Sequence, residues 1–539
     1  MKTELHKTRK AAFLYAAIAG ALFTIALLHA CRAPKVTITQ YTPVDQPADL
    51  LPDYRGSVIP PNIAPLNFLI QHKGTGYFAR IFSEKGNPIE IFSKTPAISI
   101  PRRVWRQLLE SNRGRQLRLE IFVKSPQSTP AEGRDEHWCC FQTATCQIAR
   151  EDIDPILVYR KIQPAHGTWR DMGIYQRNLS SFDESVVLTN EYFKHGCLNC
   201  HAFCGQRPDK MLIGIRSADY GSSALLIEGD KVQKIGTKLG YTSWHPSGRG
   251  AAFSVNEVRQ FFHAAAGEVR DVIDLESLIA YYQVDSKTVK TTKDLARKDR
   301  LETYPTWSPD GRYMYFCSAP ITWSDRKAVP ESYDQIKYDL VRASYDLQLD
   351  QWGPLESVLS AQKTGLSILL PRVSPNGRWL LFCMCDYGCF PVFRRSSDLY
   401  MMDLEAAKQT GNFACERLDI NSNESESWHC WSSNSRWIAF SSKRGSGVFT
   451  RIYIAYVDEN GKVHKPIRLP QKDPTYYESC LWTYSVPELV TEPVRVTGER
   501  LGRVVRSPRK ISVEMPITMA TPKAGKPAEY QQPPQAERE

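Results

Sequence analysis

The residues from Lys194 to Cys204, KHGCLNCHAFC, carry the chemically most distinctive pattern of the chain, a single C-x-x-C-H motif. Cys197 and Cys200 are separated by two residues, and His201 follows at once. This spacing suits covalent attachment of haem c, in which the two thiols add to the vinyl groups and the histidine becomes the proximal iron ligand. The motif therefore predicts one haem c held by Cys197, Cys200 and His201.

Three other uses of the same residues stay open. A thioredoxin-type C-x-x-C begins a helix between two strands, but strand-like sequence flanks this motif on both sides. A zinc site would need a second ligand pair, and Cys204 with a distant histidine is a poor substitute. A disulfide between Cys197 and Cys200 would close an unusually tight loop. Haem is the favoured interpretation, and Cys204 has no assigned role.

The sixth iron ligand is less clearly marked than the proximal one. Met172 and Met211 are the candidates, because methionine is an established axial ligand and an extended chain lets either residue reach the haem of His201. His195 lies too close to the attachment loop to reach the opposite haem face, and His245 stands at a turn position of the repeat described below. A five-coordinate iron is the remaining alternative.

The N-terminal segment predicts export and a membrane tether. Residues 1–10 carry four Lys and Arg against one Glu, and the twenty residues from Ala11 to Ala30 carry no charge. A stretch of this length can span a bilayer as a helix, and its positive flank keeps the N-terminus in the cytoplasm. Residues 1–34 are therefore interpreted as a signal anchor or, because LLHAC resembles a lipoprotein box, as a signal peptide with a lipid at Cys31. Both interpretations place the remaining chain on the periplasmic side of a bacterial envelope, where haem c is attached.

The composition argues against nucleic acid as a partner. The formal net charge is +11, yet Lys and Arg are spread along the 539 residues. There is no basic run that could follow a phosphate backbone. The expected partners are instead the membrane, through the N-terminal segment, and a redox protein or envelope complex.

One phrase recurs four times in the larger part of the chain. The copies are WHPSGR from 244, WSPDGR from 307, VSPNGR from 373 and WSSNSR from 431, each leading into a hydrophobic strand. Pro, then Asp or Asn, then Gly favour a tight turn, so each copy predicts a hairpin. Further strands are expected at 277–285, 339–346, 398–404 and 451–458. Repeated units of three or four strands are typical of β-propeller blades.

These hairpins resemble the WD40-like repeats of TolB-like β-propellers. The resemblance covers about residues 154–496, and the fourth copy departs from it because it lacks both Pro and Gly. It implies an all-β fold with a propeller over 151–500. About six blades are expected, and residues 476–496 are a candidate for a closing strand. The haem motif then falls between early propeller strands, as an insertion near 194–210.

The regions outside the repeats have other patterns. Residues 35–150 alternate apolar and polar residues between turns, which predicts a small β-sandwich with a short helix or turn at 104–112. Residues 501–539 are assigned to a C-terminal tail, largely disordered, because its end is rich in Pro, Ala, Gln and charge.

The remaining cysteines can be sorted partly by the repeat. Cys317, Cys383 and Cys430 fall at repeat positions where other copies have Ser, Thr or Arg, so they are interpreted as small strand residues. Two clusters, at 139–146 and 383–389, lack the paired spacing of a structural zinc site. Short-loop disulfides are the simpler expectation for these clusters in an oxidising compartment.

The expected function is electron transfer by a membrane-tethered, extracytoplasmic monohaem cytochrome c on a propeller scaffold. The sequence has no second C-x-x-C-H, His-rich copper cluster or nucleotide motif, so autonomous catalysis is not expected. The alternative is a TolB-like scaffold for protein–protein interaction in the cell envelope, with the haem as a sensor or absent, because propellers host many functions.

Overall fold

The computed structural model describes residues 38–125, 137–163, 171–263 and 270–513, and most of them lie in strands or turns. Among these residues, no helix is long and apolar enough to cross a membrane. The uncharged segment from Ala11 to Ala30 and Cys31 lie outside the described residues. The membrane tether therefore stays a prediction.

The N-terminal part of the described chain contains two sheets and one helix. The larger sheet has seven strands: β1 (Thr42–Pro47), β3 (Val58–Ile59), β5 (Gly76–Phe82), β6 (Ile89–Ser93), β8 (Gln116–Lys124), β9 (Trp138–Gln142) and β10 (Ala144–Ile148). The smaller sheet has three: β2 (Leu50–Leu51), β4 (Phe68–Ile70) and β7 (Ala97–Ile98). The helix expected at 104–112 is α2 (Arg102–Ser111).

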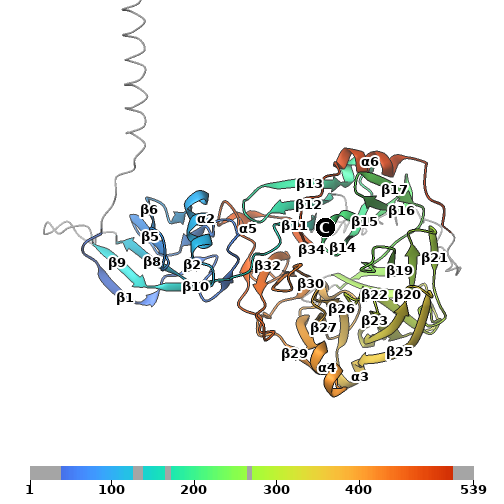
Figure 1. Ribbon diagram of the computed structural model, residues 1–539. Helices are drawn as coiled ribbons and strands as arrows, with labels where there is room; N and C mark the ends of the chain where they lie inside the picture. The colour runs from blue at the N-terminus through green and yellow to red at the C-terminus, as the bar shows by residue number, and fades with distance from the viewer. Residues whose placement is uncertain (1–37, 126–136, 164–170, 264–269, 514–539) are drawn as a thin grey trace, which may run out of the picture.

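One apolar core joins these elements to each other and to the rest of the molecule. Ile81 of β5, Phe68 of β4 and Trp105 of α2 are all buried in it. Trp437 and Ile452, far along the chain, belong to the same core. The N-terminal sheets therefore pack against the later sheets rather than standing apart from them, as Figure 1 shows.

Six four-stranded antiparallel sheets follow and surround one axis (Figure 1). The first three are β34 (Thr483–Val490), β11 (Ile156–Ile162), β12 (Met172–Asn178) and β13 (Glu184–Thr189); β14 (Cys197–Cys204), β15 (Arg207–Ser217), β16 (Gly221–Glu228) and β17 (Lys231–Ile235); β18 (Thr242–Trp244), β19 (Gly250–Phe262), β20 (Arg270–Gln283) and β21 (Thr288–Lys290).

The next three are β22 (Arg300–Trp307), β23 (Tyr313–Pro320), β24 (Asp339–Asp346) and β25 (Gln351–Leu359); β26 (Ser367–Val373), β27 (Trp379–Cys385), β28 (Asp398–Asp403) and β29 (Cys415–Arg417); β30 (Glu426–Trp431), β31 (Trp437–Ser442), β32 (Arg451–Tyr456) and β33 (Ile467–Arg468). The strands expected at 339–346, 398–404 and 451–458 match β24, β28 and β32 to within two residues.

The ring is closed by pairing the two ends of the propeller segment. The innermost strand of the first sheet is β34, which comes from residues 483–490, whereas its other three strands come from residues 156–189. Each innermost strand contacts the next, in the order β34, β14, β18, β22, β26, β30 and back to β34. The closing strand expected within 476–496 is therefore β34, and the all-β propeller is confirmed.

Short helices connect or cover the sheets. They are η1 (Asn190–Phe193), η2 (Tyr333–Gln335), α3 (Ala361–Thr364), η3 (Pro391–Phe393), α4 (Leu404–Thr410), α5 (Tyr476–Ser479) and α6 (Gly498–Arg506).

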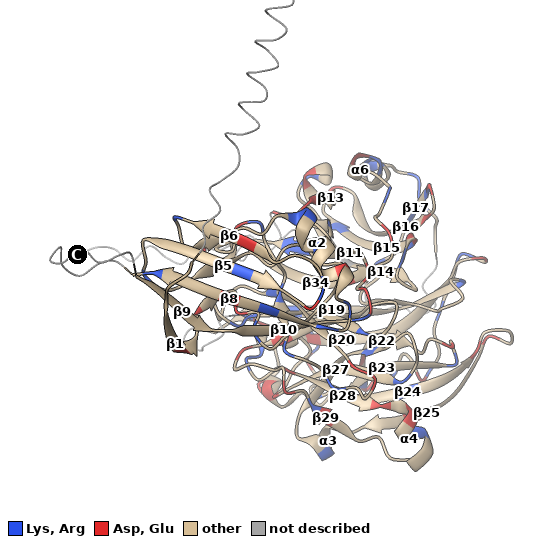
Figure 2. Ribbon diagram, turned by 60° about the vertical axis from the view of Figure 1, so that its left-hand side comes forward, with Lys and Arg blue, Asp and Glu red and all other residues tan. Residues whose placement is uncertain are grey.

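The start of the expected disordered tail is ordered, which corrects the assignment of 501–539. Leu501 and Val505 of α6 are buried against the first two sheets, while its arginines, whose positions are blue on the ribbon of Figure 2, are exposed. The buried Lys234 ammonium donates a 2.7 Å hydrogen bond to the Val505 carbonyl, which caps the helix end. Ile511 then pairs with Ile235 at the outer edge of β17. Residues 514–539 lie outside the described residues.

Candidate functional site at the propeller axis

The C-x-x-C-H motif lies within β14, the innermost strand of the second sheet. It was expected as an insertion between strands, and this expectation is wrong. Leu198 and Ala202 are buried in the apolar clusters on either side of the sheet, and the strand pairs antiparallel with β15 before and after a break in register at residues 199–200. The motif therefore continues a blade and faces the axis of the ring.

The middle of the motif occupies a β-bulge that recurs in other innermost strands. Pairing of β14 with β15 shifts register between Leu198 and His201. The same shift occurs across residues 303–306 of β22 and 369–372 of β26. A bulge inserts an extra residue and turns the chain locally. Asn199 and Cys200 thus hold the backbone position that Tyr304–Pro305 and Leu370–Pro371 hold elsewhere.

These bulges surround a small cavity on the axis. Its volume is about 40 Å³. Its lining residues come from all six innermost strands and the residue before β18: His201, Tyr241, Thr242, Tyr304, Pro305, Leu370, Pro371, Arg372, Trp428, His429, Val486 and Pro487. Four of them, Tyr304, Leu370, Trp428 and Val486, have left-handed backbone angles with φ between 45° and 55°. Such strain in large residues is uncommon and often marks a functional site.

His201 is buried without a hydrogen-bond partner. Its exposed fraction is 1%, and neither Nδ1 nor Nε2 has a partner among the described residues. Burial lowers the pKa of His201 to about 3, and the positive charges of Arg160 and Arg372 lower it further, whereas the backbone of Val158 acts in the opposite direction. The imidazole is therefore neutral at physiological pH, and apart from this interaction with the Val158 backbone its nitrogens have no partner among the described residues.

The cysteines near His201 point to different neighbours. Cys197 is half-buried beside the cluster between the first two sheets, and burial raises the pKa of its thiol while Arg216 and Arg160 lower it. Cys204 is buried on the other side, where its thiol donates to the His245 carbonyl at 3.8 Å. The side chain of Cys200 lies outside the described parts.

Met172 and Met211 both pack between the first and second sheets rather than in the axial cavity. The Met172 sulfur accepts a hydrogen bond from the backbone N–H of Leu198 at 3.2 Å, so it touches the motif's own strand. Met211 is fully buried in β15, opposite Phe203. The structure thus brings Met172 onto the motif, while His201 faces the axis.

His429 is the site residue that sequence reasoning missed. It lines the same cavity from β30 and is 3% exposed. Its Nε2 lies 3.1 Å from the Leu381 carbonyl oxygen, and its Nδ1 lies 3.7 Å from the Cys383 sulfur. Burial lowers the pKa of His429 to about 3, mainly through desolvation and then through Arg372. The repeat could have located this residue. Trp428–His429 stands before the phrase WSSNSR at the same distance at which Tyr304–Pro305 stands before WSPDGR.

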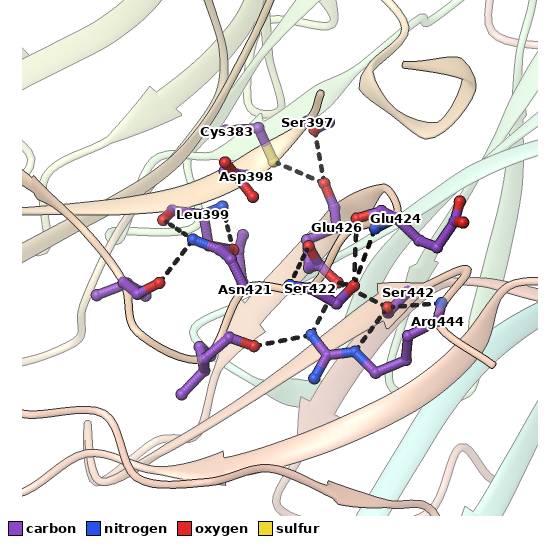
Figure 3. A network of polar contacts seen from close by, with 12 residues as sticks. Cys383, Ser397, Asp398, Leu399, Asn421, Ser422, Glu424, Glu426, Ser442 and Arg444 are labelled. Carbon is purple, nitrogen blue, oxygen red and sulfur yellow. Dashed lines mark hydrogen bonds and ion pairs between the residues drawn. The ribbon is translucent and has the colours of Figure 1, made fainter. Parts of the chain in front are cut away.

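A buried polar network fixes the start of β30 (Figure 3). The Glu426 carboxylate is fully buried and accepts hydrogen bonds from Arg444 Nη2 at 2.7 Å, Ser422 Oγ at 2.7 Å and Ser442 Oγ at 2.8 Å. The Cys383 thiol donates to the Glu426 carbonyl at 3.6 Å. These bonds hold the strand that presents His429 to the axis.

The other cysteine clusters are not bridged. The cysteines whose side chains are described are free thiols, including Cys139, Cys140, Cys146, Cys383, Cys385 and Cys389. The expected short-loop disulfides are therefore absent from the described residues, where these thiols instead contact backbone carbonyls or pack in the core. No group of three potential metal ligands occurs within the described ranges. Cys317, Cys383 and Cys430 are buried strand residues.

Comparisons with known proteins give distant likenesses. No family model and no curated protein matches the chain. A GH74 enzyme of Niastella koreensis has a TM-score of 0.35 at 11% identity, covering 56% of this chain and 44% of that one. Prolyl oligopeptidase B of Galerina marginata has a TM-score of 0.32 at 10% identity, covering 56% and 41%.

An oligogalacturonate lyase of Vibrio parahaemolyticus has a TM-score of 0.31 at 14% identity and covers 64% of this chain and 88% of that one. Likenesses at this level carry no functional argument. The fold assignment rests on the chain's own six sheets and their closure.

Proposed function

We propose that the chain is a membrane-tethered, extracytoplasmic monohaem cytochrome c in which a β-propeller carries the haem and exchanges single electrons with a redox partner. The main support is the conjunction at the axis of a C-x-x-C-H pattern and a His201 imidazole that is buried, neutral and unpartnered. Bound haem c supplies a one-electron iron couple. Propeller folds host many functions, so the site and not the fold supports this proposal.

The donor set fits haem c. Cys197 and Cys200 would carry the thioether bonds, and the neutral His201 ring would ligate the iron, because a metal ligand needs an unprotonated nitrogen. The space fits less well, since the axial cavity measures about 40 Å³ and cofactor pockets usually have about 300–1,000 Å³. Attachment is therefore expected to displace side chains of the axial bulges.

The proposal is tested by producing the full chain in a host with cytochrome c maturation machinery. The pyridine haemochrome spectrum of the denatured protein should report one covalent haem per chain. Cys197→Ala and Cys200→Ala should lower this value, and the double variant should abolish it. Cys204→Ala is the matched control, because Cys204 lies on the same strand but faces the third sheet. Absence of covalent haem from the wild type would overturn the proposal.

Met172 is the better candidate for the sixth iron ligand, because its sulfur already touches the motif's strand. Methionine ligation raises the potential of a c-type haem. A redox titration of the holoprotein should therefore show a lowered potential for Met172→Leu and little change for Met211→Leu. Unchanged potentials and spectra in both variants would reject both methionines.

The second candidate is a propeller scaffold for protein–protein interaction in the cell envelope. Its support is the pairing of β14 with β15 within a closed ring and the small volume of the axial cavity. A wild-type protein that is exported, folded and free of haem in the same host would favour this function.

A further inference from the structure

A second cavity lies between the third and fourth sheets, outside the C-x-x-C-H site. Its volume is about 160 Å³. Its inner wall consists of His245, Tyr281, Trp307, Tyr345 and Leu347. An engineered cavity of about 150 Å³ binds benzene inside a protein, so a compact organic group fits here.

The aromatic walls of this cavity stand at angles to each other. The Trp307 ring lies 4.8 Å from the His245 ring and 5.3 Å from the Tyr345 ring, and Tyr281 lies 6.0 Å from Tyr345. Each of the four residues is at most 8% exposed. Arg249 and Asp285, which form a 2.9 Å ion pair, also line the cavity and are more than half exposed, so they mark its opening to the solvent.

The indole of Trp307 lacks the contact that the tryptophans at the same position of other repeats make. The indole N–H groups of Trp244 and Trp431 each donate at 3.1 Å to a carbonyl of the preceding innermost strand, at Ala202 and Arg372. The Trp307 indole N–H has no partner among the described residues although this side chain is buried. The usual inter-blade contact is therefore missing where the cavity occurs.

The polar atoms of the other walls are already engaged. The Tyr281 and Tyr345 hydroxyls donate to the Asp350 carboxylate at 3.1 and 2.8 Å, and Lys290 pairs with the same carboxylate. Both nitrogens of His245 are hydrogen-bonded, to Ser247 and the Gly311 carbonyl. The deep walls thus consist mainly of aromatic rings, and the polar atoms of Tyr281, Tyr345 and His245 already have partners within the protein.

These aromatic walls favour a quaternary ammonium group over a primary one. A primary ammonium carries three N–H donors that need acceptors, and its burial without them is costly. A quaternary ammonium has no donors and is attracted to aromatic faces. We infer that the cavity binds a quaternary ammonium group of choline size, with the ligand's oxygen free to accept from Trp307. This inference is independent of the haem proposal.

The test is isothermal titration of the full chain with choline and with 3,3-dimethylbutan-1-ol, its neutral carbon isostere. Choline should bind at least about tenfold more tightly, as expected for a desolvated cation–π site. Leu347→Phe should fill the cavity and abolish choline binding. Leu349→Phe is the matched control, because Leu349 is 64% exposed and does not line the cavity.

Trp307→Leu should also lose binding, with its fold checked by circular dichroism. No choline binding by the wild type, equal binding of the neutral isostere, or unchanged binding by Leu347→Phe would each overturn the inference.

Discussion

Two histidines line one axial cavity from the second and sixth sheets, and they differ in how their ring nitrogens are used. Both are almost fully buried, and burial lowers the pKa of each to about 3. The neutral His429 ring donates from Nε2 to the Leu381 carbonyl at 3.1 Å, and its Nδ1 lies 3.7 Å from the Cys383 sulfur. Within the part of the chain that the structure describes, His201 has no well-formed hydrogen bond at either nitrogen and interacts only with the Val158 backbone. A buried polar group without a partner is costly, so hydrogen bonding offsets the burial of His201 in the second sheet less than that of His429 in the sixth.

The strands that carry the two histidines, β30 and β14, also differ in how firmly their surroundings hold them. The start of β30 is fixed by the Glu426 network of Figure 3. The motif in β14 is preceded by Lys194 and His195 in left-handed conformations. We therefore expect β14 to be the innermost strand that can open for a cofactor and β30 to be a rigid wall.

The largest expected effect is on the network at β30. Glu426→Ala leaves the Arg444 guanidinium beside Glu426 without its buried partner, which typically costs about 3–5 kcal/mol. Urea unfolding of the purified chain measures this cost. Ser442→Ala is the control, because it removes one hydroxyl and should cost about 1 kcal/mol. Equal losses in the two variants would show that Glu426 does not hold the strand.

Replacing either histidine should change the free energy of unfolding by a smaller amount. The two replacements should act in opposite directions. In protein produced without haem, His429→Leu should lower the free energy of unfolding by about 1–3 kcal/mol, because the Leu381 carbonyl loses its donor. His201→Leu should leave it unchanged or raise it, because no hydrogen bond is lost. A destabilisation by His201→Leu as large as that by His429→Leu would remove the distinction between the two residues.

The third expected effect is a pH dependence of the stability that His429 contributes. A histidine with a folded pKa of about 3 and an unfolded pKa of about 6.5 binds its proton only in the unfolded state between these values. Its contribution to stability is therefore present above pH 6.5 and is lost as the pH falls toward 3. The free-energy difference between wild type and His429→Leu should shrink by up to about 1.4 kcal/mol per pH unit between pH 6 and 4. A difference independent of pH would indicate that His429 is solvated.

The sequence predicted the hairpins well because their turns are local. Pro, Asp and Gly at fixed offsets determine the turn within six residues, so the four phrases fall at the turns between β18 and β19, β22 and β23, β26 and β27, and β30 and β31. The positions of Cys317 and Cys383 followed from the same alignment. Aligning the repeats was sufficient for these two cysteines because equivalent positions in the repeats have equivalent surroundings in the fold.

The place of the C-x-x-C-H motif could not be predicted in this way. β14 turns into β15 through Gly205–Gln206, without the hairpin phrase, so the repeat gave no alignment for the second sheet. Its bulge becomes visible only when the pairing with β15 is known. The order of residues 501–513 likewise depends on distant partners, because Leu501 and Val505 are buried by strands more than 200 residues away.

The most direct test of the central claim compares the haem spectrum of His201 and His429 variants. In the holoprotein, His201→Ala should keep the covalent haem but lose the low-spin absorption bands and the imidazole signature in electron paramagnetic resonance, because the proximal ligand is gone. His429→Ala should retain the wild-type spectrum, with His429 acting only in packing. A His201→Ala protein with an unchanged spectrum would contradict the assignment of His201 as the iron ligand.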